Sequence, residues 1–168
     1  TIQSLVSKNV EATKSKRLTF RVNPTTVTSA VIFDVLAQVS TGGNVAYHFG
    51  IFPDGSLKYH NSVTTDPWIT LSSGGPGTVP FNVWSEIRVD ATISPATASV
   101  YLNGVLKGVA PMFINPANVQ YLNGFTFATG GTGPTGDQAI FDDVLIDELI
   151  YASNTFEADA VGAVPSGF

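Results

Sequence analysis

Residues 81–105 read FNVWSEIRVDATISPATASVYLNGV, and this stretch decides the fold. Apolar and polar residues alternate over residues 86–93 and again over 98–102, as in strands that bury one face. Ser94-Pro95-Ala96 turns the chain between them. Asn103-Gly104 is the dipeptide most typical of a two-residue hairpin, because both residues tolerate positive φ. The stretch therefore predicts three consecutive antiparallel strands, the last over residues 105–109.

Strand signals of the same kind continue on both sides of this stretch. Pro53-Asp54-Gly55 predicts a turn that joins residues 44–52 and 56–62 in a second hairpin. One long apolar run, residues 29–39, is interrupted by Asp34. The remaining expected strands cover residues 16–22, 68–71, 121–128 and 140–151. No amphipathic helix alternates with them, so we expect an all-β fold, a two-sheet antiparallel jelly-roll β-sandwich of about ten to twelve strands.

Three short motifs in the second half of the chain resemble a known family. WSEIRV at residues 84–89, SVYLNG at 99–104 and IDELIY at 146–151 occur in this order. They are similar to motifs of the laminin-G/pentraxin-like branch of the concanavalin A-like lectin/glucanase superfamily, although the third motif is shorter before its final Tyr. The resemblance implies a jelly roll. In such a sandwich we expect Trp84 to plug one end of the core.

The length of the chain favours one domain. The chain has 168 residues, and a domain usually has about 150. We therefore expect a single domain over residues 1–168, with an extended N-terminal segment at 1–15 and a C-terminal tail at 153–168. The tail is expected to hold one helical turn near residues 156–160.

Charge and cysteine content exclude several classes of function. Lys and Arg number 8 and Asp and Glu 13, so the net charge is 8 − 13 = −5, which argues against nucleic acid and anionic membranes as partners. No window approaches the ~20 apolar residues of a membrane span, so we expect no membrane insertion. The absence of Cys excludes disulfides, thiolate zinc sites and a Cys nucleophile. Few charges and many Thr, Ser, Gly and Asn are typical of secreted β proteins, so we expect an extracellular, cell-surface or virion-surface location.

Two histidines mark the first candidate site. His48 and His60 stand on the two arms of the second predicted hairpin, six residues on either side of Asp54. They occupy opposing positions, so both are expected on one face, together with Lys58. A pair of histidines could bind a metal, polarise a substrate or hydrogen-bond a sugar hydroxyl, and a plain polar face is the alternative.

Aromatic residues near these histidines suggest sugar binding. A flat ring with a polar edge suits the C–H face of a sugar. Trp68 is the best single candidate, because it follows Asp66-Pro67 in a segment that core packing constrains little. Packing under the loop at residues 74–80 is the alternative. The candidate ligand-binding residues are Trp68, Tyr47, His48, Tyr59 and His60.

Carboxylates give weaker signals for catalysis. Asp143 and Asp147 share one face of the 140–151 strand, but residues four apart on a strand are separated by about 13 Å at ~3.3 Å per residue. Glycosidases need their two carboxyl groups within roughly 5–9.5 Å of each other. A cross-strand pair such as Asp90 with Asp143 stays open. We therefore name no catalytic residue and lean away from an enzyme.

The sequence leaves bound calcium open. The resemblance implies it, because domains of that family often hold one Ca²⁺ through Asp side chains and backbone carbonyls, hard oxygen ligands that suit this cation. No continuous calcium-binding loop occurs in the sequence. The candidate ligands are Asp137, Asp142 and Asp66.

These observations rank three functions. The first is a non-catalytic, lectin-like carbohydrate-binding domain that presents aromatic and polar residues to an extracellular glycan. The second is a structural or adhesive subunit of an extracellular or viral assembly, in which the extended N-terminal segment would dock on a neighbouring copy. The third is a small glycan-cleaving enzyme on the same fold. The fold alone does not choose among them.

Overall fold

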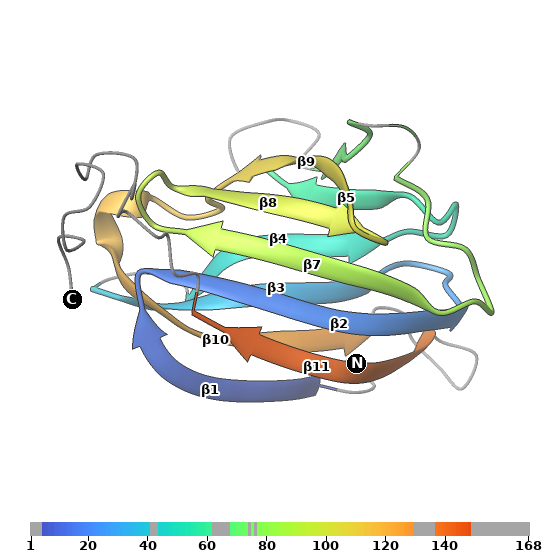
Figure 1. Cartoon of the computed structure of the whole chain (residues 1–168), viewed down its shortest axis with the longest axis horizontal. Helices are drawn as coiled ribbons and strands as arrows, with labels where there is room; N and C mark the ends of the chain where they lie inside the picture. Colours follow the sequence, from blue (N-terminus) through green and yellow to red (C-terminus); the bar gives the residue numbers. More distant parts are fainter. Residues whose placement is uncertain are drawn as a thin grey trace, which may run out of the picture.

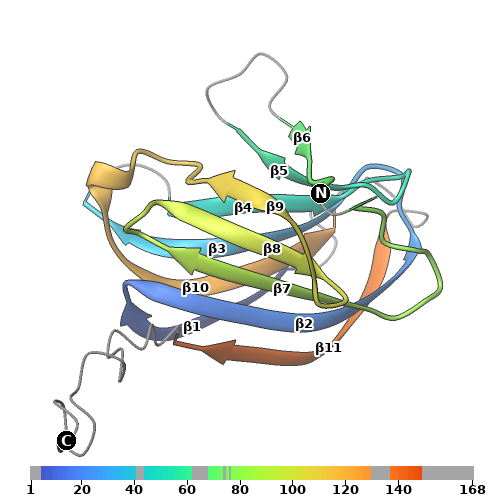
Figure 2. The same cartoon turned by 45° about the horizontal axis from the view of Figure 1, so that its top comes forward.

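The computed structural model describes residues 5–40, 44–61, 68–73, 75, 77–129 and 137–148. Two antiparallel sheets face each other in a sandwich, with the five-stranded sheet in front in Figure 1 and both layers tilted in Figure 2. The six-stranded sheet has the order β1 (Leu5–Thr13), β10 (Val119–Thr129), β3 (Val31–Val39), β4 (Val45–Ile51), β5 (Leu57–His60) and β6 (Trp68–Thr70). The five-stranded sheet has the order β11 (Gln138–Asp147), β2 (Ser15–Thr26), β7 (Ser85–Thr92), β8 (Thr97–Leu102) and β9 (Val105–Pro111). The helical element of the described residues is one short 3₁₀ turn, η1 (Pro116–Asn118), so the predicted all-β sandwich is confirmed.

The stretch that predicts the fold forms β7, β8 and β9 as expected. Asn103 and Gly104 have φ values of 49° and 78°, the positive values that the tight β8–β9 turn requires. The backbone of Glu86 on β7 binds the β8–β9 turn at Asn103. Its N–H donates to Asn103 Oδ1 at 2.8 Å, and its carbonyl accepts from the Asn103 N–H at 2.9 Å. The second predicted hairpin forms β4 and β5.

Alternate side chains of both sheets fill the space between the layers. Phe20 of β2 meets Phe33 of β3 edge to face at 5.3 Å, and Phe33 stacks on Phe49 of β4 at 5.2 Å. Phe127 of β10 closes the group 4.9 Å from Phe20. These rings are almost wholly buried, and each burial contributes about 1.5–3 kcal/mol. The intervening side chains of the same strands consequently point outward.

The start of β7 differs from the expectation. Trp84 does not plug the core: it is 36% exposed, and its ring centroid lies 5.2 Å from the guanidinium carbon of Arg21. The alternation of β7 explains this, because Ser85 takes the buried position and Trp84 therefore faces outward.

The two ends of the chain are described to different extents. The N-terminal segment contributes β1, which pairs with β10 at the edge of the six-stranded sheet. The tail at residues 153–168, with the helical turn expected near 156–160, lies outside the described residues. Within the described ranges, no helix has the length and apolar character needed to cross a membrane.

Candidate functional site

A row of polar and aromatic side chains crosses the outer face of the six-stranded sheet. Strand register sets Thr126 of β10 beside Asp34 of β3, and Asp34 beside His48 of β4. The ladders from β4 to β5 and from β5 to β6 continue the row to His60 and Trp68. Directly paired residues share one side of a sheet, and the residues that alternate with them face the core. We call these five residues the His–Trp row.

The rings of the row contact one another. Trp68 packs against both histidines, with ring centroids 4.9 Å from His48 and 5.0 Å from His60. The two histidine rings are 5.5 Å apart. Phe113, which follows β9, adds a ring 5.0 Å from His60, and its N–H donates to the Ala46 carbonyl of β4 at 2.7 Å. The histidines are thus part of a packed aromatic surface.

Gly50 of β4 makes room for a further aromatic contact. A Cβ at Gly50 would stand 3.1 Å from Phe52 Cε2 and 3.4 Å from Trp68 Cζ3. The missing side chain lets both rings lie against the sheet, edge to face and 4.9 Å apart. Lys58 of β5 pairs with Gly50 and extends over the Phe52 ring, with Nζ 4.6 Å from the ring centroid. Lys58 therefore lies beside the aromatic surface, next to Phe52.

Asp34 fixes the orientation of His48. Its Oδ1 lies 2.6 Å from His48 Nδ1, and its Oδ2 accepts a hydrogen bond from Thr126 Oγ1 at 3.2 Å. Asp34 is 8% exposed, so water competes little for this pairing. With Nδ1 held by the carboxylate, Nε2 is the nitrogen of His48 left for other partners. The sequence marks Asp34 as an interruption of an apolar run and His48 as a candidate site residue, but nothing in the sequence predicts that the two residues pair or that Thr126 joins them.

His60 differs from His48 because no carboxylate of the described residues holds its ring. Its Nδ1 is covered and contacts no hydrogen-bonding group of the described residues. Burial, and to a smaller extent the neighbouring His48, lower the pKa of His60 below its ordinary value of 6.5. Neutral His60 is therefore favoured near neutral pH, with one ring nitrogen as donor and the other as acceptor.

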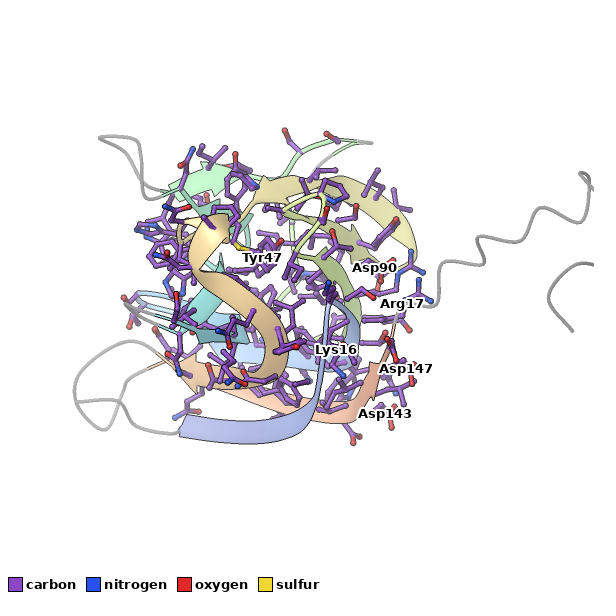
Figure 3. The ribbon with its side chains drawn as sticks, turned by 90° about the vertical axis from the view of Figure 1, so that its left-hand side faces the viewer. Lys16, Arg17, Tyr47, Asp90, Asp143 and Asp147 are labelled. Carbon is purple, nitrogen blue, oxygen red and sulfur yellow. The ribbon has the colours of Figure 1, made fainter. Side chains whose placement is uncertain are left out.

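The structure brings together three of the predicted ligand-binding residues, which are Trp68, His48 and His60. It corrects the prediction for Tyr47, which is wholly buried between the sheets (Figure 3) and whose hydroxyl donates to the Thr92 carbonyl. The same burial raises the pKa of Tyr47. Tyr59 also faces the interior, where it packs, partly buried, against the core. The physical reason is the period of two, which turns both tyrosines away from the histidines beside them.

The candidate calcium ligand Asp137 has several partners within the fold. It lies just before β11 and accepts hydrogen bonds from the backbone N–H groups of Thr28, Ser29 and Ala30. Burial by itself raises the pKa of Asp137, but these hydrogen bonds outweigh it and hold the pKa below the ordinary value. Asp137 therefore ties the start of β11 to the segment before β3.

The other two candidate ligands are placed differently. Asp142 is exposed on β11, where its side chain accepts a hydrogen bond from the Asp143 N–H at 2.8 Å. Asp66 lies outside the described residues. In the part of the chain that the structure describes, no group of three or more His, Asp or Glu residues is placed to hold a metal ion. Calcium bound by Asp137, Asp142 or Asp66 stays a prediction.

Comparison with known families identifies the fold. Residues 5–161 match a family described as "Concanavalin A-like lectin/glucanases superfamily". The chain belongs to this superfamily. The match covers both sheets and confirms the resemblance that the three sequence motifs carry. A search of curated proteins finds no match.

Solved structures share this lectin-like fold at low sequence identity. A sialidase superposes with a TM-score of 0.67 and 11% identity, over 86% of this chain and 14% of the sialidase. The galectin LEC-6 of Caenorhabditis elegans gives a TM-score of 0.54 and 14% identity, over 87% of this chain and 92% of the galectin. The alginate lyase Aly36B gives a TM-score of 0.57 and 12% identity, over 86% and 74%. The chain thus spans a small part of the sialidase but most of the galectin and the lyase.

Proposed function

We propose that this chain binds a glycan, without cleaving it, on the outer face of its six-stranded sheet. The observation that carries the proposal is the His–Trp row, in which Trp68 packs against His48 and His60. Such a surface offers flat apolar rings beside ring nitrogens that donate or accept hydrogen bonds. Sugars present the matching combination, apolar C–H faces with hydroxyls at their rims.

The proposed mechanism is recognition by a preformed surface. A sugar ring lies on Trp68, and the Nε2 atoms of His48 and His60 exchange hydrogen bonds with its hydroxyls. The rings already pack against one another, and Asp34 already holds His48. Binding therefore orders few side chains, and little affinity is lost to their conformational entropy.

Relatives by fold support a ligand of this kind. Lectins are named in the description of the superfamily. A variant of the alginate lyase Aly36B has been solved in complex with an alginate tetrasaccharide. An extracellular or surface location fits a protein that meets such polymers, and we propose it together with glycan binding.

Glycan cleavage has less support than glycan binding. The strands around the row, β3, β4, β5, β6 and β10, contain one carboxylate, Asp34. Its two oxygens already face His48 and Thr126. Cleavage by a pair of carboxyl groups needs a second acidic residue within reach. These strands therefore favour binding over hydrolysis by that mechanism.

Two tryptophan variants test the proposal. The chain has two tryptophans, Trp68 in the row and Trp84 beside Arg21 on the five-stranded sheet. On a glycan array, the wild-type protein and Trp84→Ala should be retained, and the affinity of Trp68→Ala should be at least about tenfold lower, equivalent to ~1.4 kcal/mol. Equal losses in both variants, or no retained glycan for the wild type, would contradict the proposal.

Two further readouts separate the alternative functions. Release of shorter products from a retained glycan would support the enzyme in place of the binding domain. Elution as a large assembly, with no glycan retained, would support the structural or adhesive subunit.

A further inference from the structure

Acidic residues are distributed unequally between the two sheets. Asp34 is the one carboxylate of the strands around the His–Trp row, and His48 and Thr126 already occupy it. The five-stranded sheet carries five carboxylates, which are Glu86 and Asp90 on β7 and Asp142, Asp143 and Asp147 on β11, whereas the whole six-stranded sheet carries two, Asp34 and Glu11 of its edge strand β1. A chain with a net charge of −5 thus keeps its strand carboxylates mostly on the sheet opposite the row.

The arginines lie on the same sheet as most of the carboxylates. All three arginines of the chain lie on the five-stranded sheet, and each is close to an acidic residue. Arg17 Nε is 2.8 Å from Asp90 Oδ1, and Arg88 Nε is 3.6 Å from the same oxygen. Arg21 Nη1 is 3.5 Å from Asp143 Oδ2. Each arginine of this sheet therefore has an acidic partner within the protein.

Lys58 is in a different situation on the six-stranded sheet. It is the one lysine or arginine of β3, β4, β5, β6 and β10, and it forms no ion pair among the described residues. The carboxylate of the nearby Asp54 accepts a hydrogen bond from the Ser56 hydroxyl at 2.5 Å. That bond lowers the pKa of Asp54, and the charge of Lys58 lowers it to a smaller extent. Lys58 thus keeps a positive charge that no described carboxylate contacts.

Lys58 lies next to the proposed sugar platform. Lys58 Nζ is 4.6 Å from the centroid of Phe52, and the Phe52 ring is 4.9 Å from the ring of Trp68. His60 follows Lys58 by two residues on β5, which places it about 7 Å along the same face. A sugar that lies on Trp68 would therefore have a lysine and a histidine at its rim.

We infer that the glycan bound at the His–Trp row is acidic, with a carboxylate or sulfate group that pairs with Lys58 and accepts a hydrogen bond from His60. The inference rests on the proposed function and names its class of ligand. An anionic group is favoured because the face offers it a cation that no carboxylate of the described residues contacts. Packing against Phe52 also reduces the exposure of that cation to water, which strengthens an ion pair.

Chemically matched glycans test the inference. The wild-type protein is applied to an array of neutral, carboxylated and sulfated glycans, and each retained glycan is offered again after carboxyl reduction or desulfation. We expect acidic glycans to be retained and the neutralised forms to bind at least tenfold more weakly. Whether carboxyl reduction or desulfation weakens binding tells which anionic group the protein recognises. If the retained glycans are neutral, or neutralisation leaves the affinity unchanged, the inference fails and the proposed function stands. If no glycan is retained, both fail.

A pair of lysine variants adds a test on the protein. Lys58→Gln should lower the affinity for the retained acidic glycan about tenfold at low salt, with a smaller difference at high salt because ions screen the pair. The affinity for the neutralised glycan should not change. Lys14→Gln is the matched control, because Lys14 is exposed between β1 and β2 and its replacement changes the net charge equally. Equal effects of the two variants would overturn the role of Lys58.

Discussion

The two outer faces of the sandwich use polar residues in opposite ways. On the five-stranded sheet, Arg17 contacts both oxygens of Asp90, at 2.8 and 2.9 Å, and the guanidinium of Arg88 lies 3.7 Å from the centroid of Tyr101. On the six-stranded sheet, Asp34 holds one nitrogen of His48 and leaves the other nitrogen available. On the first face the charged side chains pair with one another, whereas on the second face His48 keeps a ring nitrogen that no described residue binds.

The two tryptophans show the same contrast. Trp84 lies beside the guanidinium of Arg21, so a cation from the protein already occupies its ring. Trp68 packs edge to face against His60 and Phe52. Trp84 is the more exposed of the two, since it is 36% exposed and Trp68 is half-buried, so exposure alone would favour Trp84 as a ligand platform. The difference lies in the neighbours, and it is the reason for placing the glycan on the six-stranded sheet.

Replacing Asp34 by Asn should have the largest effect on this contrast. Asn keeps the size of the side chain but removes the charge that holds His48, and a hydrogen bond to a charged group contributes about 1.5–3 kcal/mol. We expect the free energy of unfolding in urea to fall by about that amount and the glycan affinity to fall with it. Asp90→Asn, on the other face, should leave glycan affinity unchanged. If Asp34→Asn binds the glycan with wild-type affinity, Asp34 does not orient His48 for glycan binding.

A smaller effect is expected from the ion pair of the five-stranded sheet. Arg17 is partly exposed, and pairs near the surface contribute about 0.2–1 kcal/mol. A double-mutant cycle with Arg17→Ala and Asp90→Ala, measured by urea unfolding, should give a coupling in this range. None of the three variants should alter glycan binding. A loss of binding in any of them would show that the two faces do not act independently.

The smallest effect should come from the titration of His60, whose ring is partly in water. Its pKa is lower in the folded chain than the ordinary 6.5, so the unfolded chain takes up the proton first. The free energy of unfolding should therefore decrease as the pH falls through about 6.5. His60→Gln should lose this part of the pH dependence, and unfolding curves between pH 8 and pH 5 measure the difference. Identical pH profiles for the two proteins would contradict the burial of His60.

The fold could be predicted because its signals are local. The alternation over residues 86–102 and the Asn103-Gly104 turn need no information from the rest of the chain. The opposing positions of His48 and His60 follow from one hairpin in the same way. The same alternation places Tyr47 in the core, next to His48 on the strand but on the opposite face. The prediction of Tyr47 as a surface aromatic was wrong because it did not apply this alternation.

The remaining parts of the site depend on contacts between distant segments. Thr126 reaches Asp34 across the β10–β3 ladder, 92 residues away in the sequence. Phe113 joins the rings from the segment after β9, and nothing in its local sequence predicts that position. The contrast between Trp68 and Trp84 also depends on neighbours from other strands. Strand order and register, which the sequence does not state, decide all of these contacts.

One NMR titration tests the central claim most directly. The two tryptophans give two indole N–H signals, one from each outer face of the sandwich. During titration with a glycan retained on the array, the Trp68 signal should shift progressively to saturation while the Trp84 signal stays in place. A shift of Trp84 with an unchanged Trp68 would contradict glycan binding on the six-stranded sheet.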